Sequence, residues 1–221
     1  MKTRIRNFVK KTFPKWYWQR LTYQQLIRNP KSFLHTSGWY QSYVQQQPQK
    51  VDGSIIPWMN YAIIDFLDDR LQNNFSLFEY GSGASTHYFA KKVAQVVSVE
   101  YDMHWYSQVK AKMPTNVQLL YRDYYENNQA YIHSITESGQ LYHLVLIDGR
   151  DRLQCMQQAA NCLHENGVLI LDDSEREKYD AAFAASVLMG FKHLTFRGFK
   201  PCGLQMVATT IFYKTDNCLG I

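Results

Sequence analysis

The feature that most constrains the fold of this chain is a regular alternation of short apolar runs with stretches of helical periodicity. The strand-like runs lie at 76–80, 95–101, 117–121, 143–148 and 167–172. The helical stretches between them lie at 84–93, 102–113, about 125–137 and 151–165. Because strand and helix alternate, the crossovers should be right-handed and the sheet parallel, with helices on both faces. Continuous Val, Leu and Ile runs are typical of strands buried on both faces.

The end of the chain departs from this alternation. After a helix at about 176–189, the segments Phe191–Arg197 and Gln205–Lys214 predict two further strands. The loop between them contains Gly and Pro and is too short for a helix, so the two strands should pair antiparallel. The sequence therefore predicts an α/β fold with a seven-stranded, mostly parallel sheet that ends in an antiparallel hairpin.

The charge is divided unevenly along the chain. Residues 1–51 contain ten Lys and Arg and no acidic residue, whereas the remainder contains 14 basic and 19 acidic residues. We therefore expect a basic, aromatic N-terminal extension over residues 1–54 and one domain over residues 55–221. The mildly acidic domain disfavours a uniformly basic nucleic-acid-binding protein, and we expect no specific nucleic-acid partner.

The first 20 residues have the pattern of a basic amphipathic segment. One helical face carries Ile5, Phe8, Val9 and Phe13, with Lys and Arg on either side. Pro14 is expected to stop the helix, and Trp16, Tyr17 and Trp18 follow it. Such a segment suits peripheral contact with an anionic membrane through residues 1–20; the alternative is a solvated arm or one packed on its own domain. The polar, Gln-rich stretch 41–50 predicts a connecting loop.

Two further patterns bear on the cellular location. No run of 18 apolar residues occurs, and the N-terminus has no apolar core typical of a secretory signal. The cysteines lack Cys-x-x-Cys spacing, which favours reduced thiols over a disulfide framework or a zinc site; they are Cys155, Cys162, Cys202 and Cys218. We expect a cytoplasmic protein, with the inner face of the membrane as a peripheral contact.

A glycine motif follows the first predicted strand. Residues 79–86 read Glu-Tyr-Gly-Ser-Gly-Ala-Ser-Thr and lead directly into a helix. Glycines at such a turn let backbone N–H groups approach a ligand at the positive end of the helix. Glu100 ends the next strand, 17 residues past Gly83, where a carboxylate can accept hydrogen bonds from both hydroxyls of a ribose. The alternative is a tight turn with an incidental surface glutamate.

On these motifs the chain resembles the class I S-adenosylmethionine-dependent methyltransferases, over about residues 55–215, and in particular bacterial O-methyltransferase-like members. The resemblance implies a Rossmann-like fold and S-adenosylmethionine as cofactor. Glu79, Gly81 and Gly83 match the family's acid-x-Gly-x-Gly motif, whereas Ser85 stands at the usual third glycine. The terminal hairpin also matches. The cofactor-binding residues implied in this way are Glu79, Tyr80, Gly81, Ser82, Gly83, Ser85, Thr86, Glu100, Tyr101, Asp123 and Asp148.

The resemblance also gives these residues separate roles. Gly81 and Gly83 would line the methionine part of the cofactor, and Glu100 would bind the ribose. Tyr101 or its neighbour would flank the adenine, and Asp123 would contact the adenine amino group.

A group of acids lies at the ends of the fourth and fifth predicted strands. It consists of Asp148, Asp172 and Asp173, which should converge beside the cofactor because ligands bind at the carboxyl ends of parallel strands. We expect Asp148 to be the catalytic residue nearest the reacting centre. A free carboxylate, with a pKa of about 3.9, is a poor base for an aliphatic hydroxyl. A divalent cation would lower the pKa of that hydroxyl.

The three acids resemble the metal site of magnesium-dependent O-methyltransferases, which makes Mg²⁺ a candidate second cofactor. In the alternative interpretation, Asp148 only contacts the cofactor, and Asp172 and Asp173 cap the next helix. Arg150 and Arg152 lie beside these acids and are candidates for binding an anionic substrate such as a uronic acid or a phosphate. Their alternative role is ion pairing with nearby acids on helix faces. Trp58, in the turn before the sheet, is either a lid over the cofactor or a core residue.

The sequence thus predicts an S-adenosylmethionine-dependent methyltransferase that acts on a hydroxyl of a small molecule or glycan. No Asn-Pro-Pro-Tyr-like sequence follows the fourth strand, which argues against N-methylation of adenine or glutamine. One alternative is a catalytically silent binding module that its basic arm recruits to membrane or RNA. The other is an NAD(P)-linked oxidoreductase that uses the same glycines and Glu100. The acceptor and the oligomeric state stay open.

Overall fold

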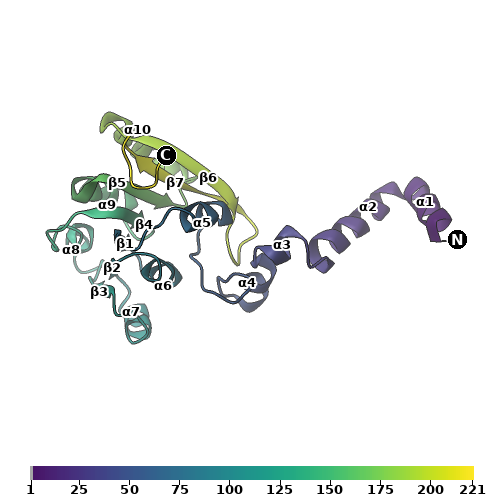
Figure 1. Cartoon of the computed structure of the whole chain (residues 1–221), viewed down its shortest axis with the longest axis horizontal. Coiled ribbons are helices and arrows are strands. Elements are labelled where there is room, and N and C mark those ends of the chain that lie inside the picture. Colours follow the sequence, from purple (N-terminus) through teal and green to yellow (C-terminus); the bar gives the residue numbers. More distant parts are fainter. Residues whose placement is uncertain (1) are drawn as a thin grey trace.

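The computed structural model describes residues 2–221 and contains one seven-stranded sheet in the order β3-β2-β1-β4-β5-β7-β6 (Figure 1). The strands are β1 Ser76–Tyr80, β2 Gln95–Glu100, β3 Val117–Tyr121, β4 Tyr142–Ile147, β5 Leu163–Asp172, β6 Lys192–Phe199 and β7 Met206–Tyr213. The first five strands are parallel, whereas β7 pairs antiparallel with both β5 and β6. The predicted α/β class, the parallel sheet and the terminal hairpin are confirmed.

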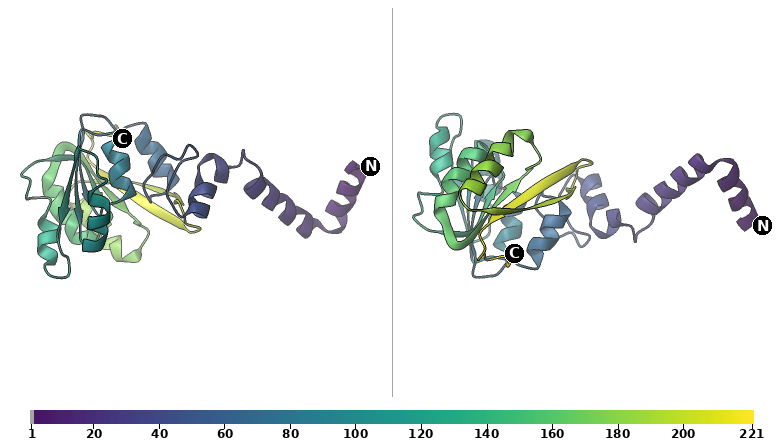
Figure 2. Two further views of the ribbon diagram at one scale, coloured as in Figure 1. Left: turned by 90° about the horizontal axis from the view of Figure 1, so that it is seen from below. Right: turned by 90° about the horizontal axis from the view of Figure 1, so that it is seen from above.

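Helices cover both faces of the sheet, as the apolar runs predict (Figure 2). Successive residues of β1 face opposite sides, so Leu77 packs in one hydrophobic cluster and Phe78 in the other. The helices are α5 Tyr61–Asp68, α6 Ala84–Ala90, α7 Met103–Lys110, α8 Asn128–His133, α9 Arg152–Ala159 and α10 Asp180–Leu188. Residues of α5 and α6 join the cluster of Leu77, and residues of α8, α9 and α10 join the cluster of Phe78.

The helices are shorter than the sequence predicts. Asp102 accepts a hydrogen bond from the backbone N–H of Trp105 at 2.8 Å and so starts α7. The helix predicted over 151–165 ends at Ala159, and a short 3₁₀ turn leads into β5 at Leu163. Leu163 pairs with Tyr142 across an irregularity in the register, which extends β5 beyond the predicted run.

The loop between β6 and β7 lies at the carboxyl edge of the sheet. Because β6 and β5 both pair antiparallel with β7, β6 runs in the same direction as β5. The loop that follows Phe199 is therefore on the same edge as the carboxyl ends of β1, β2, β4 and β5. The indole N–H of Trp39, the first residue of α4 (Trp39–Gln45), donates a hydrogen bond to the Gly203 carbonyl of this loop at 2.8 Å.

The chain enters the domain through a series of short helices. They are α1 Lys2–Thr12, α2 Pro14–Tyr23, the π-helix η1 Gln24–Arg28, α3 Phe33–Thr36 and α4. The segment 2–28, here named the N-terminal arm, extends away from the sheet and its helices (Figures 1 and 2). None of the residues 5–31 is buried, whereas Ser32, Trp39 and Ser42 are. The packed part of the chain thus begins before residue 54.

Two features of this region bear on the sequence predictions. Helix α1 ends at Thr12, as Pro14 predicts, but Pro14 also occupies the first position of a new helix, α2, where its missing N–H leaves no hydrogen bond unmade. The Gln-rich stretch 41–50 is not a loop throughout, because its first half lies in α4. Within residues 2–221, no helix is long and apolar enough to cross a membrane. All four cysteines are free thiols, and Cys155 and Cys162 are buried.

Candidate active site

The turn between β1 and α6 requires a glycine at its first position. Gly81 has a φ of +94°, and a Cβ added there would lie 3.0 Å from the carbonyl oxygen of Asp148 at the end of β4. Both observations exclude an ordinary side chain. The backbone N–H of Gly81 donates to the Val99 carbonyl at 2.9 Å, which holds the turn against β2.

Glu79 holds this turn in place through hydrogen bonds on the side that faces away from the cavity. Its carboxylate is buried and accepts hydrogen bonds from the hydroxyls of Ser85, Thr86 and Ser98, the last at 2.9 Å. Burial raises the pKa of Glu79 to about 7, although these hydrogen bonds lower it. Thr86 in turn accepts from the N–H of Gly83 at 2.9 Å. Glu79 and Thr86 therefore fix the conformation of the turn and do not line the cavity in front of it.

A cavity of about 480 Å³ opens in front of the turn, at the carboxyl edge of β1 and β2. Seven of the eleven residues predicted to bind the cofactor line it: Gly81, Ser82, Gly83, Ser85, Glu100, Tyr101 and Asp148. Its volume is in the range of ordinary ligand sites, which is roughly 300–1,000 Å³. The cavity is thus built where the sequence motif predicts a ligand.

Glu100 has its carboxylate fixed at the wall of this cavity. One oxygen accepts from the N–H groups of Tyr101 and Asp102, both at 2.9 Å. The other accepts from the N–H of Ser82 at 3.1 Å and from its hydroxyl at 2.8 Å. The Ser82 hydroxyl is a rotatable donor, so this second oxygen is the one whose partner a ligand can replace.

Two tryptophans complete the cavity wall, and the sequence motifs predict only one of them. Trp105 lies on α7, and its indole N–H donates to the Ser82 carbonyl at 2.9 Å. Nothing in the sequence marks a tryptophan on a predicted surface helix as a ligand-site residue. Trp58 also lines the cavity with 45% of its surface exposed, so it is not a core residue.

Two of the predicted cofactor residues are used elsewhere. Asp123 accepts from the N–H groups of Tyr125 and Glu126 at 2.9 and 3.1 Å, and from the hydroxyl of Tyr121 at 3.1 Å. The hydrogen bond from Glu126 is the main reason why the pKa of Asp123 lies below its usual value. Asp123 caps a turn and lines neither this cavity nor the next one. The Tyr80 hydroxyl donates to the Ile132 carbonyl at 2.7 Å, inside the domain.

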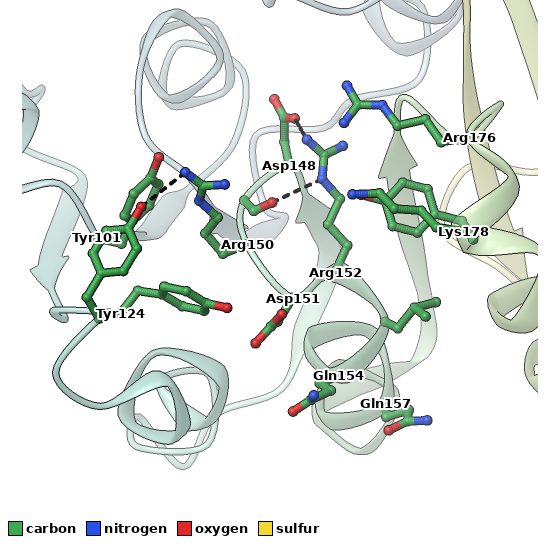
Figure 3. Close-up of a pocket in the computed structure, with 14 residues that line it drawn as sticks. Tyr101, Tyr124, Asp148, Arg150, Asp151, Arg152, Gln154, Gln157, Arg176 and Lys178 are labelled. Carbon is green, nitrogen blue, oxygen red and sulfur yellow. Dashed lines mark hydrogen bonds and ion pairs between the residues drawn. The ribbon is translucent and has the colours of Figure 1, made fainter.

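A second cavity, of about 800 Å³, adjoins the first and shares Tyr101, Asp148 and Gly149 with it (Figure 3). Its wall combines tyrosines with cationic side chains: Tyr101, Tyr124, Tyr125, Tyr179, Arg150, Arg152, Arg176 and Lys178. The Arg150 guanidinium lies over the Tyr101 ring, 4.9 Å from its centre, and donates to the Tyr125 hydroxyl at 3.3 Å. Arg150 is thus turned towards the junction of the two cavities.

Arg152 ties the ends of β4 and β5 together. Its side chain is 9% exposed and donates to the Asp148 carboxylate at 2.8 Å and to the Gly149 carbonyl at 3.1 Å. It also donates to the backbone carbonyl of Asp172. The alternative role, ion pairing with acids on helix faces, is wrong for Arg152, because its partners are Asp148 and Asp172 at the strand ends. Figure 3 shows Arg152 directed towards Asp148 at the centre of the wall.

The three acids converge as predicted, since one oxygen from each of Asp148, Asp172 and Asp173 lies within 4.8 Å of the others. Asp173 pairs with Lys200 at 2.9 Å and with Arg176. Asp172 accepts from the Thr209 hydroxyl at 2.6 Å. The turn at Asp173 leads to a 3₁₀ helix at Glu177–Tyr179 whose start has no side-chain cap, so the predicted capping role is wrong.

The negative charges of this acidic cluster are offset by cationic side chains of the protein itself. Burial raises the pKa of Asp172 well above its usual value, and the charges of Asp148 and Asp173 add to the effect. Burial acts in the same direction on Asp173, but Lys200 and Arg176 outweigh it and lower the pKa of Asp173. A divalent cation would face Arg152, Arg176 and Lys200 at close range. This arrangement does not fit a Mg²⁺ site.

Comparisons with known proteins identify the fold. No family model matches the sequence, and no curated protein matches it either. Precorrin-6y C5,15-methyltransferase from Geobacter metallireducens GS-15 has a similar structure, with a TM-score of 0.55, 13% identity and coverage of 70% of this chain and 88% of that one.

Two further solved structures are similar. The O-methyltransferase TomG from Streptomyces achromogenes, solved with S-adenosylmethionine, gives a TM-score of 0.52 at 15% identity, over 68% of this chain and 77% of that one. Precorrin-8w decarboxylase from Methanobacterium thermoautotrophicum gives a TM-score of 0.52 at 15% identity, over 69% of this chain and 87% of that one. Together with the strand order and the terminal hairpin, these similarities show that the chain has the fold of the class I S-adenosylmethionine-dependent methyltransferases.

Proposed function

We propose that this protein is an S-adenosylmethionine-dependent methyltransferase that modifies a hydroxyl oxygen on a small molecule or glycan. One observation carries the proposal: the Gly81 turn, the Glu100 carboxylate and Asp148 line a single cavity at the carboxyl edge of the sheet. That edge is where open α/β sheets bind their ligands.

The first cavity suits S-adenosylmethionine. Its volume, the close approach that Gly81 permits and the fixed carboxylate of Glu100 match a ligand that carries a ribose diol. When bound, this cofactor supplies an electrophilic methyl group on a sulfonium. The Glu100 carboxylate would accept a hydrogen bond from a ribose hydroxyl in place of the one from the Ser82 hydroxyl. Tyr101 and Trp105 would contact the rest of the ligand.

The second cavity suits an acceptor with both a sugar-like face and a negative charge. Tyrosine rings provide flat surfaces for stacking, and four cationic side chains surround them. In the described part of the chain, Arg152 and Arg176 form ion pairs with acids, whereas Arg150 and Lys178 form none. Arg150 and Lys178 are therefore the cations available to a uronate or phosphate group.

Asp148 lies on the wall of both cavities and is our candidate for the catalytic residue. Burial raises the pKa of Asp148 above its usual value, although the charge of Arg152 lowers it. A carboxylate with a raised pKa is a better base than a free aspartate. Asp148 would orient the acceptor hydroxyl towards the first cavity and take up its proton.

The two alternatives differ in what they require of the structure. A dinucleotide-binding dehydrogenase has parallel strands in the order 3-2-1-4-5-6, whereas this sheet has an antiparallel β7 between β5 and β6. A catalytically silent binding module would have no need of a working cofactor site. Cofactor binding therefore separates the proposal from both alternatives.

The test is calorimetric titration of the whole chain with S-adenosylhomocysteine, with NAD and NADP as comparison ligands. We expect micromolar binding of S-adenosylhomocysteine, weakened by about tenfold to a hundredfold in Glu100→Ala because a charged hydrogen bond is lost. Glu126→Ala, which changes an exposed glutamate outside both cavities, should bind like the wild type. A wild-type protein that does not bind S-adenosylhomocysteine would contradict the proposal.

The acceptor is tested by transfer of a labelled methyl group to uronic acids, sugar phosphates, phenols and amines. We expect transfer to an anionic hydroxyl compound, equal with Mg²⁺ and with a chelator. Asp148→Asn should lose turnover while retaining S-adenosylhomocysteine binding. Wild-type turnover in Asp148→Asn would remove Asp148 from the reaction, and exclusive transfer to amines would show that the acceptor atom is nitrogen.

A further inference from the structure

The N-terminal arm exposes an unusual amount of apolar surface. Seven of its large apolar side chains are between 45% and 65% exposed: Ile5, Phe8, Phe13, Trp16, Trp18, Tyr23 and Leu26. None of the arm's residues from 5 onwards is buried, and the arm extends away from the domain (Figure 1). Exposed apolar surface on this scale is typical of an interaction site.

The charge of the arm is entirely positive. No acidic residue occurs before Asp52, and Arg6, Lys10, Lys11, Lys15, Arg20 and Arg28 all lie in the arm. The first ion pair along the described chain is that of Lys50 with Asp68, so these cations have no carboxylate partner in the described residues. Several of them lie over the exposed rings instead, with Lys10 5.0 Å from the centre of Trp18 and Arg20 5.4 Å from that of Trp16.

We propose that residues 5–28 bind the protein to an anionic membrane surface. The apolar side chains Ile5, Phe8 and Val9 fall on one face of α1, between cations on either side, as in helices that lie in the plane of a membrane interface. Tryptophan and tyrosine are enriched at the same depth of the bilayer. A nucleic-acid backbone would attract the same cations but would leave the aliphatic face of α1 in water. The arm therefore suits a lipid surface better than RNA.

The position of the arm connects the membrane to the candidate active site. The chain continues from the arm through α3 into α4, which packs on the loop between β6 and β7. Trp39 donates to the Gly203 carbonyl at 2.8 Å, and the Cys202 thiol contacts the Ser42 carbonyl at 3.0 Å. Lys200, at the start of this loop, pairs with Asp173. A membrane-bound arm would hold the carboxyl edge of the sheet beside the bilayer, where an acceptor carried on the membrane surface can reach it.

The test is sedimentation of the full chain with vesicles of phosphatidylcholine alone or mixed with phosphatidylglycerol. We expect binding to the mixed vesicles only, weakened by high salt because the charges are exposed. The variant K10E/K11E/K15E should bind at least about tenfold more weakly, since each cation near an anionic surface adds to the affinity. The variant W16S/W18S should also bind more weakly, at unchanged charge.

The matched control is K91E/K110E/K112E, which changes the net charge equally but on exposed positions of the domain. It should bind vesicles like the wild type. The two arm variants should retain the wild-type unfolding temperature, because none of the arm's residues from 5 onwards is buried. Equal loss in the control and the arm variant would overturn the proposal. So would absence of vesicle binding together with tight binding of single-stranded RNA that the arm variant loses.

Discussion

The carboxyl edge of the sheet has two polar regions that use their charges differently. Above β1 and β2, the Glu100 carboxylate is held by backbone N–H groups and by Ser82, and it faces an open cavity. Above β4 and β5, the carboxylates of Asp148 and Asp173 are paired with cationic side chains of the protein itself. The first region has an exchangeable partner for a ligand, whereas the second has largely satisfied its own charges.

This difference distinguishes a ligand-binding site, above β1 and β2, from a cluster of ion pairs that holds the ends of β4 and β5 together. Acidic residues at strand ends occur in both regions, so residue type and position do not distinguish the two. Their partners distinguish them. A hydroxyl such as that of Ser82 can exchange with a ligand at little cost, whereas breaking the pair of the buried Arg152 with the partly buried Asp148 leaves a charge uncompensated. Asp148 belongs to both regions, because it pairs with Arg152 and also lines the two cavities.

The largest expected effect is on the free energy of unfolding and tests the ion-pair cluster above β4 and β5. Arg152→Ala removes a 9%-exposed side chain that contacts Asp148 and two backbone carbonyls, and it should lower the free energy of unfolding by about 3–5 kcal/mol. Arg176→Ala removes a side chain that is 46% exposed and should cost at most about 1 kcal/mol. Urea unfolding measures both. Equal losses in the two variants would mean that Arg152 does not hold the strand ends together.

The next effect is on ligand binding and tests the cavity above β1 and β2. Gly81→Ala places a Cβ within 3.0 Å of the Asp148 carbonyl, so the turn must move, and S-adenosylhomocysteine binding should weaken by roughly a hundredfold. Gly139→Ala is the control, because Gly139 also has a positive φ, of +63°, but no atom within 4 Å of the added Cβ. Both variants carry a backbone strain of about 1–3 kcal/mol. If both bind the ligand equally well, the close approach at Gly81 is irrelevant to the cavity.

The contrast between the two regions also explains what the sequence could predict. The sheet, its hairpin and the glycine turn follow from periodicity and from backbone geometry, which are local properties of the chain. Whether a charged side chain is available to a ligand depends instead on partners that are distant in sequence. Lys200 reaches Asp173 from 27 positions away, and no pattern around either residue indicates the pair.

Asp123 and Trp105 illustrate the same limit at closer range. Asp123 is at the strand end that favours a ligand contact, yet the turn that follows offers its carboxylate two backbone N–H groups at once. Such local hydrogen bonds compete with any ligand for the same oxygen. Trp105 is the reverse case, since only the folded chain brings its ring beside Ser82, 23 positions earlier.

The last expected effect concerns Glu79, whose buried carboxylate holds the Gly81 turn through the hydroxyls of Ser85 and Thr86. The pKa of Glu79 is raised by burial from 4.5 to about 7, so between these values the folded state retains a proton that the unfolded state has released. The free energy of unfolding should therefore fall as the pH rises from about 4.5 to 7, by at most about 1.4 kcal/mol per pH unit. In Glu79→Gln this part of the pH dependence should disappear.

Urea unfolding at intervals across this range measures the difference between wild type and Glu79→Gln. Other groups titrate in both proteins, so only the difference between the two curves reports on Glu79. The exposed Glu126→Gln variant should follow the wild-type curve throughout. A Glu79→Gln curve parallel to the wild type would show that the carboxylate stays ionised in the fold. In that case the hydroxyls of Ser85, Thr86 and Ser98 fully compensate its burial, and the turn that they hold is insensitive to pH.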